Sequence, residues 1–391
     1  MVHRFSFRRG IMGGMKTLRD LPELNDVPVL VRAALNVPVA DGKVVNTFRL
    51  RAALPTIEYL RTRGAKIILI GHLGDVGTET LRPVYEAMKE FISRISFCPV
   101  ATGAEARAAV RALSPGEVLM LENLRRYTGE KDNDPTFASE LASLADLFVQ
   151  DSFDVCHRTH ASVVGIPALL TSYAGLQLEI EVRELGKALA PEHPALAIIG
   201  GAKFSTKEPV LKKLLALYDQ VFVGGALAND FMKAKGQPVG TSLVSGADQE
   251  ALAALMQNPK LELPEDYVVA PMGSERSDGH LTGITVVAPD EAILDDGPKT
   301  IEHLTARVQA AKVVLWNGPL GNYEKGFVEG TEALARAISS SGAHSIVGGG
   351  DTIAAIEKLG VSDKISFIST GGGAMLDFLA EGTLPGIKAL A

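Results

Sequence analysis

Short apolar runs alternate with amphipathic stretches along the whole chain. A strand that is covered on both faces is apolar at successive positions, so these runs predict buried strands. The stretches between them have helical spacing, for example from Arg51 to Arg61 and from Ile353 to Leu359. This alternation predicts an α/β protein with parallel sheets covered by helices. The expected strands are 27–31, 66–70, 118–121, 147–149, 196–199, 220–223, 267–270, 312–316, 345–347 and 365–368.

One amphipathic stretch near the middle of the chain differs from the others. From Leu176 to Ala190, leucine and valine repeat at helical spacing with glutamate between them, and Pro191 follows. Because proline ends a helix, we expect one helix here that joins two domains. The expected organisation is an N-terminal domain of residues 15–175, a joining helix of residues 176–190, a C-terminal domain of residues 191–375 and a tail of residues 376–391.

Composition narrows the class of protein. The chain has 391 residues, of which 46% are hydrophobic and 22% charged, so it can form two hydrophobic cores. A formal net charge of -7 argues against a general nucleic-acid binder. Two cysteines, Cys98 and Cys156, make no disulfide framework and favour the cytoplasm. No apolar stretch predicts a membrane span.

The first 14 residues are unlike the rest of the chain. Residues 2–14 contain three arginines and one histidine but no acidic residue, and Met15 begins a run that resembles a natural start. A targeting segment is one reading, although no long apolar stretch follows. We expect residues 1–14 to be a disordered or spurious extension.

Glycine follows nearly every strand expected in the second half. Parallel strands bind ligands beyond their carboxyl ends, where glycine lets a backbone approach closely and helix N-termini offer N–H groups to phosphate. Five such turns in one domain predict an anion or nucleotide site, although no P-loop or dinucleotide motif occurs. The turns contain Gly200-Gly201, Gly224-Gly225, Gly318, Gly348 to Gly350 and Gly371 to Gly373.

Charged residues beside these turns suggest further chemistry. Asp351 follows a triple glycine, where it is equally consistent with a helix cap and with a Mg²⁺ ligand. In the first half, basic residues lie at or beyond strand ends, where arginine suits phosphate and carboxylate. His157 and His160 lack further ligands at the spacing of a metal site. The basic residues are Arg32, Arg49, His72, Arg125, His157, Arg158 and His160.

These motifs, in this order, resemble the phosphoglycerate kinase family from about Leu18 to Leu390. The resemblance is carried by Leu30-Val31-Arg32 with Asn36-Val37-Pro38, Arg49 to Ile57, His72-Leu73-Gly74, Leu121 to Arg125, His157-Arg158 with His160-Ala161-Ser162, Gly200 to Lys203, Gly297 to Thr300, Trp316 to Pro319, Gly348 to Thr352 and Ser369 to Ala374. So many ordered motifs make chance similarity untenable.

The resemblance implies two Rossmann-like domains that face a hinge cleft, with a C-terminal tail returning to the N-terminal domain. It implies a monomer that acts on small molecules, with no nucleic-acid or membrane partner. The N-terminal domain would bind 3-phosphoglycerate through Asn36, Arg49, His72, Arg125 and Arg158. The C-terminal domain would bind ATP or ADP with Mg²⁺ through Lys207, Asn317, Glu324, Gly349, Gly350, Asp351 and Thr352, with Asp351 as the metal ligand.

The resemblance also implies the groups that act on the transferred phosphoryl. Arg49 and Lys203 would neutralise its charge, and Gly372 and Gly373 would offer backbone N–H groups. This suits phosphoryl transfer, in which positioning and charge stabilisation supply most of the catalysis.

Three positions of the N-terminal half depart from the family pattern. Ala34 stands where an aspartate is expected, Asp75 where an arginine is expected, and Asp154 where a glycine is expected. Three hypotheses follow: a phosphoglycerate kinase with an altered acceptor site, a kinase for another small carboxylate, or a catalytically weak nucleotide-binding homologue with a regulatory role. The retained Arg49 and Lys203 favour an enzyme.

Overall fold

The computed structural model describes residues 14–391, so nearly all of the expected extension at residues 1–14 lies outside the described residues. Contacts divide the chain into two units. The N-terminal unit extends to Arg183 and also includes Glu381–Ala391, and the C-terminal unit is Glu184–Ala380. The division falls within helix α7 (Leu176–Ala188) and at the end of α14 (Gly372–Glu381), whereas the sequence analysis placed boundaries at 175, 190 and 375.

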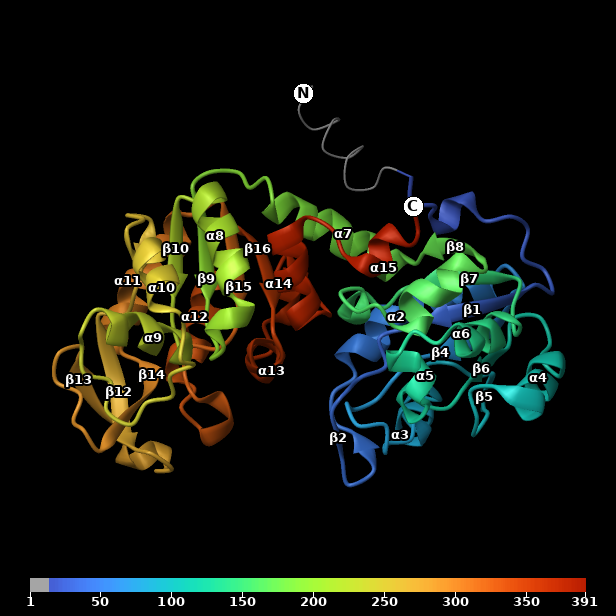
Figure 1. Ribbon diagram of the computed structural model, residues 1–391, viewed down its shortest axis with the longest axis horizontal. Helices are drawn as coiled ribbons and strands as arrows, with labels where there is room; N and C mark the ends of the chain where they lie inside the picture. The colour runs from blue at the N-terminus through green and yellow to red at the C-terminus, as the bar shows by residue number, and fades with distance from the viewer. Residues whose placement is uncertain (1–13) are drawn as a thin grey trace. The chain divides into compact units, whose positions relative to one another are not determined.

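The N-terminal unit is built on a parallel sheet of order β5-β6-β4-β1-β7-β8 (Figure 1). Along β1, Val29 and Val31 pack on one side with α2 and α3, and Leu30 packs on the other with α4 and α6. Burial on both faces explains the continuous apolar runs. The elements are β1 (Pro28–Arg32), β4 (Lys66–Ile70), β5 (Ile95–Phe97), β6 (Val118–Met120), β7 (Leu147–Gln150), β8 (Thr171–Ala174), α2 (Phe48–Arg61), α3 (Arg82–Met88), α4 (Gly103–Arg111), α5 (Thr128–Lys131) and α6 (Pro135–Ala142), with a hairpin of β2 (Val39–Ala40) and β3 (Lys43–Val44).

The C-terminal unit has a second parallel sheet, of order β11-β10-β9-β15-β16-β17. Helices α11, α12 and α13 share a hydrophobic core with one face of this sheet, around the buried Trp316. The elements are β9 (Ala195–Ile199), β10 (Gln220–Val223), β11 (Leu261–Glu262), β15 (Val313–Asn317), β16 (His344–Gly348), β17 (Phe367–Ile368), α8 (Glu208–Leu217), α9 (Ala226–Ala234), α10 (Gln249–Met256), α11 (Pro298–Ala310), α12 (Glu329–Ser339) and α13 (Gly350–Lys358).

The apolar run at 267–270 belongs to neither parallel sheet, which corrects the sequence interpretation. It forms β12 (Asp266–Pro271), which pairs antiparallel with β13 (His280–Gly283) and β14 (Glu291–Asp296). Val269 packs in one apolar cluster and Val268 in another, so this strand is also buried on both faces. An unbroken apolar run indicates that both faces of a strand are buried, and strands of an antiparallel sheet can also be buried on both faces.

Each parallel sheet has a point where the order of its strands reverses. In the N-terminal unit β1 lies between β4 and β7, and in the C-terminal unit β9 lies between β10 and β15. Loops leave such a point in opposite directions, which opens a crevice at the carboxyl ends of the strands. Among the described residues, no helix is both long and apolar enough to cross a membrane.

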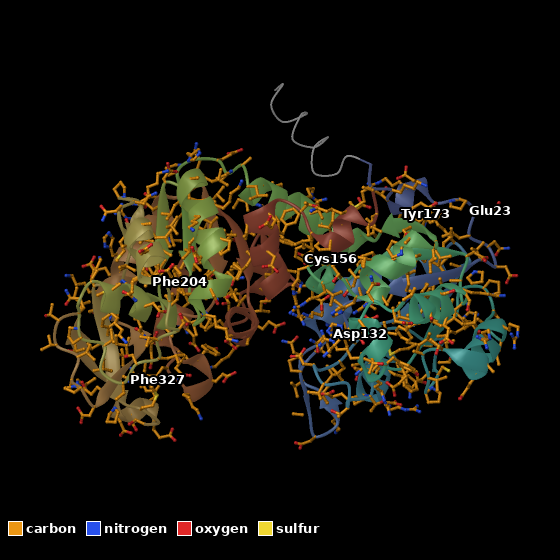
Figure 2. All side chains as sticks on the ribbon, viewed as in Figure 1. Glu23, Asp132, Cys156, Tyr173, Phe204 and Phe327 are labelled. Atoms are coloured by element: carbon orange, nitrogen blue, oxygen red, sulfur yellow. The ribbon has the colours of Figure 1, made fainter. Side chains whose placement is uncertain are left out.

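The C-terminal segment packs within the N-terminal unit. Helix α15 (Pro385–Lys388) lies beside Cys156 (Figure 2), and the Gly386 N–H donates to the Cys156 carbonyl at 2.8 Å. A Cβ at Gly386 would come within 2.8 Å of Val163 Cγ1, so only glycine allows this approach. Burial raises the pKa of the Cys156 thiol, which remains protonated.

A buried carboxyl group at the start of α7 predicts a pH-dependent stability. Asp151 Oδ1 accepts the N–H of Gln177 at 2.9 Å, and burial raises the pKa of Asp151 from 3.8 to about 8. Between these values the native state holds a proton that the unfolded chain releases, so the free energy of unfolding falls as pH rises. We expect Asp151→Asn to stabilise the protein increasingly from pH 4 to pH 8, measured by thermal unfolding. A difference in Tm that is constant with pH would contradict this.

Candidate active site

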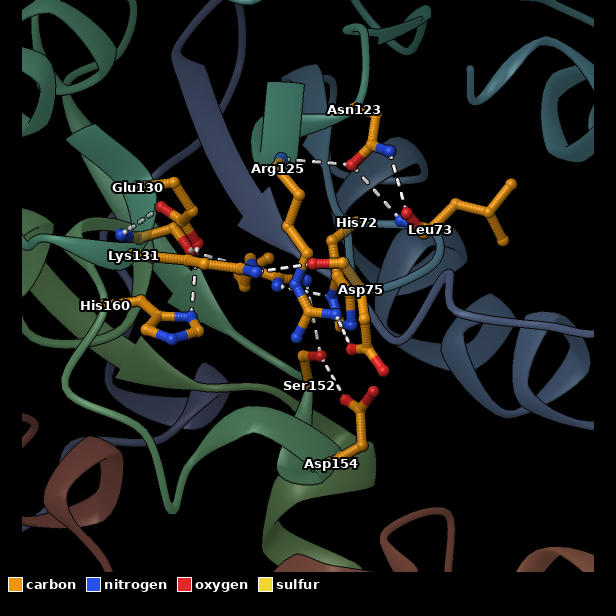
Figure 3. Close-up of polar contacts among 12 residues, drawn as sticks. His72, Leu73, Asp75, Asn123, Arg125, Glu130, Lys131, Ser152, Asp154 and His160 are labelled. Atoms are coloured by element: carbon orange, nitrogen blue, oxygen red, sulfur yellow. Dashed lines mark hydrogen bonds and ion pairs between the residues drawn. The ribbon is translucent and has the colours of Figure 1, made fainter. Parts of the chain in front are cut away.

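Two buried residues form the centre of a basic cluster at the carboxyl ends of β1 and β4. The Arg32 side chain is fully buried and donates to Ser162 Oγ at 3.0 Å and to His72 Nδ1 at 2.9 Å. Burial and the neighbouring Arg32 lower the pKa of His72 well below 6.5. His72 is therefore neutral, and since its Nδ1 accepts from Arg32, its Nε2 carries the proton and is a hydrogen-bond donor. Figure 3 shows His72 among the surrounding polar groups.

Arg49 and Asn36 lie beside this centre. Arg49, from α2, donates to the Asn36 carbonyl at 2.5 Å, and the Asn36 side-chain oxygen accepts the Gly74 N–H at 3.0 Å. Arg49 and Arg125 both help to lower the pKa of His72, which places their charges near the imidazole. The structure thus brings together four of the five residues expected to bind the acceptor.

Asp75 is paired with one of these arginines. Arg125 Nη1 donates to Asp75 Oδ1 and to the Gly74 carbonyl, and Lys131 donates to the Asp75 carbonyl (Figure 3). The Asp75 side chain is 91% exposed, whereas that of Arg125 is 8% exposed. Asp75 therefore reaches in from solvent and neutralises an arginine expected to bind the acceptor.

Arg158 lies at the margin of the cluster. Its side chain is exposed and makes no hydrogen bond or ion pair with the described residues. It contributes, after burial, Arg125 and Arg32, to lowering the pKa of His160 to about 4. Arg158 and His160 therefore share the positive region, and Arg158 is available to an anionic ligand.

The glycine turns of the C-terminal unit pack backbone against backbone. A Cβ at Gly200 would lie 2.2 Å from the Pro319 carbonyl oxygen, and one at Gly225 would lie 2.7 Å from the same oxygen. Gly349 has a φ of 105°, and a Cβ there would lie 3.2 Å from the backbone nitrogen of Gly318. The turns after β9, β10, β15 and β16 thus pack against one another and form one surface, on which the partly exposed backbone of Gly201, Gly225 and Gly349 suits a phosphate chain.

Two lysines border this surface, and neither has a counter-ion among residues 14–391. A Cβ at Gly201 would lie 3.1 Å from Lys207 Nζ, and burial together with Lys203 lowers the pKa of Lys207. Neither lysine side chain makes an ion pair or hydrogen bond with the described residues. Two like charges held together in this way favour the binding of an anion between them.

Two acidic residues, Asp351 and Glu324, lie near the turn that follows β16. Asp351 occupies the first turn of α13, and burial and then Glu324 raise its pKa. The buried Thr352 Oγ1 has no hydrogen-bond partner among the described residues. Asn317 Nδ2 lies 3.5 Å from the Gly372 carbonyl, and Gly373 follows at the exposed start of α14. One carboxylate beside a phosphate surface fits Mg²⁺, which takes few protein ligands and completes its shell with phosphate and water.

Comparison with known proteins identifies the chain. A family model described as phosphoglycerate kinase matches residues 18–382. The chain belongs to the phosphoglycerate kinase family. Phosphoglycerate kinase of Moorella thermoacetica is 46% identical over 391 residues, covering 96% of this chain and 98% of that protein. That of Thermus thermophilus is 43% identical and covers 96% of this chain and 100% of its own length.

Solved phosphoglycerate kinases have the same fold. The enzyme of Coxiella burnetii matches with a TM-score of 0.81 at 36% identity, covering 96% of this chain and 98% of that one. The enzyme of Pyrococcus horikoshii matches with a TM-score of 0.86 at 30% identity and the same coverage. The α/β fold and the kinase family predicted from the sequence are confirmed.

Two polar residues of the phosphoglycerate kinase motif at 121–125 have a role that the sequence analysis missed. The buried Asn123 accepts the N–H of Leu73 at 3.2 Å and donates to the Leu73 carbonyl at 2.8 Å. Glu122 accepts the Leu81 N–H at 2.8 Å. The hydrogen bonds of Asn123 and Glu122 thus hold in place the loop that contains Asp75. The signal was an acid and an amide directly after a buried strand, where both side chains need partners.

Proposed function

We propose that this protein catalyses reversible phosphoryl transfer between 1,3-bisphosphoglycerate with MgADP and 3-phosphoglycerate with MgATP. The reaction belongs to glycolysis and gluconeogenesis, and we place the protein in the cytoplasm as a monomer. The observation that supports this proposal is a pair of half-sites. One unit has an arginine cluster around neutral His72, and the other has Lys203 and Lys207 beside glycine turns, where neither lysine is paired with a described residue.

The residues of the N-terminal unit suit a small anion that carries both a phosphate and a carboxylate. Arg125 and Arg158 offer guanidinium donors to its phosphate, and His72 Nε2–H adds a neutral donor. Arg49 lies on α2 beside Asn36 and would counter the charge of the acceptor carboxylate and of the phosphoryl group it receives.

The residues of the C-terminal unit suit a nucleotide. Lys207 would hold its phosphates, Lys203 would stabilise the transferring group, and the N–H groups of Gly349, Gly350, Gly372 and Gly373 would face phosphate oxygens. Glu324 would meet the ribose, with Asn317 and Thr352 near the phosphates. Asp351 would hold Mg²⁺, which neutralises phosphate charge when bound.

We expect MgADP to bind the C-terminal unit with or without turnover. Trp316 is buried and its Nε1 donates to the Gly318 carbonyl at 2.9 Å, so nucleotide contact with that loop should change its fluorescence. Calorimetry should show binding that Lys207→Ala weakens and that the exposed Lys213→Ala leaves unchanged. Absence of MgADP binding by calorimetry would refute the nucleotide assignment.

The decisive experiment is a coupled assay with purified protein, MgATP and 3-phosphoglycerate. Turnover supports the proposal. The ion pair between Asp75 and Arg125 supports a second candidate, a kinase for another small carboxylate, because it reduces the charge available to a phosphate. Turnover of another carboxylate without turnover of 3-phosphoglycerate would favour that candidate. Nucleotide binding without any turnover would favour a regulatory homologue.

A further inference from the structure

The loop after β7 carries a carboxylate that the roles above leave unused. Asp154 lies in the short helix Phe153–Val155 and is half-buried. The Ser152 hydroxyl donates to Asp154 Oδ1, and Arg32 Nη1 donates to Ser152 Oγ at 3.4 Å. Figure 3 shows the Asp154 carboxylate turned toward Ser152. A short relay of hydrogen bonds from a buried arginine therefore fixes the orientation of Asp154.

This carboxylate lies at the reversal point of the N-terminal sheet. Strands β1 and β7 are neighbours with Arg32 opposite Gln150, and the Asp151 N–H donates to the Arg32 carbonyl at 2.9 Å. The chain leaves β1 toward Ala34 and leaves β7 toward Asp154. Both residues are thus on the two loops that border the crevice where such sheets bind ligands. The side chain of Ala34 is a methyl group, which cannot accept a hydrogen bond from a ligand.

Asp154 supplies a hydrogen-bond acceptor beside groups that are mostly donors. Arg32, Arg125 and the Nε2 of His72 are all donors. Asn36 already accepts from Gly74, and Asp75 is paired with Arg125. Asp154 Oδ2, in contrast, accepts no hydrogen bond from the described residues and is not buried. A fixed acceptor among donors selects a ligand group that donates.

Phosphoglycerate has one such group. Its phosphate and carboxylate accept hydrogen bonds, whereas its hydroxyl donates. We propose that Asp154 is a positioning and specificity residue whose Oδ2 accepts the hydrogen bond of the acceptor hydroxyl, a contact that Ala34 cannot make. This inference rests on the proposed function, since it concerns the same acceptor. It assigns to the enzyme a preference for a 2-hydroxy acid over the matching deoxy acid.

The test compares two ligands on three proteins by calorimetry. The ligands are 3-phosphoglycerate and its 2-deoxy analogue, 3-phosphooxypropanoate. A hydrogen bond to a charged acceptor favours the hydroxy acid by about tenfold in wild type. In Asp154→Ala the preference should fall to about one, whereas Asp146→Ala, which removes an exposed carboxylate just before β7, should keep it. If Asp154 had a purely structural role, Asp154→Ala would weaken the binding of both ligands equally and leave the ratio of their affinities unchanged.

The outcomes separate this inference from the proposed function. An Asp154→Ala protein that keeps the wild-type preference overturns the inference, even if wild type turns over 3-phosphoglycerate. A wild type that prefers the hydroxy acid through Asp154 but transfers no phosphoryl group supports the inference and overturns the proposed function. A wild type that binds neither ligand overturns both.

Discussion

Replacing Lys203 by alanine should lower kcat by about 10²–10³ while leaving the fold intact. Lys203 is exposed at the end of the turn after β9 and makes no ion pair with the described residues. Its removal therefore breaks no ion pair or side-chain hydrogen bond with the described residues, but in the proposed reaction it takes away a positive charge where phosphoryl charge develops. Steady-state kinetics with saturating MgATP and 3-phosphoglycerate measure the loss.

The matched control for this variant is Lys213→Ala. Lys213 is an exposed lysine on α8. Its replacement by alanine removes the same charge as Lys203→Ala, but at a position away from the glycine turns. We expect it to keep wild-type kcat and both variants to keep the wild-type Tm. A Lys203→Ala protein with near-normal kcat would remove Lys203 from the chemistry, whatever its effect on KM.

The second large effect is expected at Asp75. Asp75→Arg changes the local charge by two units and releases Arg125 from its ion pair. Each unit charge about 5 Å from a unit charge on the phosphate is worth about 0.8 kcal/mol at the dielectric constant of water, and more near a protein surface. We therefore expect the KM for 3-phosphoglycerate to fall at least tenfold, with the KM for MgATP unchanged.

Asp75→Asn separates the two contributions to this effect. It releases Arg125 without adding a cation, so its KM for 3-phosphoglycerate should lie between those of wild type and Asp75→Arg. An unchanged KM in both variants would mean that the exposed Asp75 is screened by solvent and plays no part in acceptor binding.

The sequence predicted the parallel sheets well because burial on both faces leaves unbroken apolar runs. Lys66–Ile70 and Gln220–Val223 appear with the predicted bounds. It missed short edge strands such as β5 (Ile95–Phe97) and β11 (Leu261–Glu262), which have only 3 and 2 residues and so form no apolar run. It also placed 267–270 in a parallel sheet, because hydrophobicity along one strand does not say in which direction its neighbours run.

The candidate site was predicted in part, for a similar reason. Motifs gave the residue types of both half-sites, and Arg49, His72 and Arg125 do lie together. The pairing of Asp75 with Arg125 could not be predicted, because it depends on a loop held from a distance by Asn123. The sequence showed only that an aspartate stands at position 75, where an arginine is expected. In the structure, this exposed carboxylate binds Arg125 of the site.

The seating of Gly386 on Cys156 has a consequence for how the protein is made. The C-terminal unit, Glu184–Ala380, is one continuous stretch of chain, whereas the N-terminal unit needs Glu381–Ala391 to be complete. A ribosome delivers those residues after everything else in both units. During synthesis, the half that is translated first therefore remains unfinished, with the surface around Val163 uncovered, until the half that is translated second has left the exit tunnel.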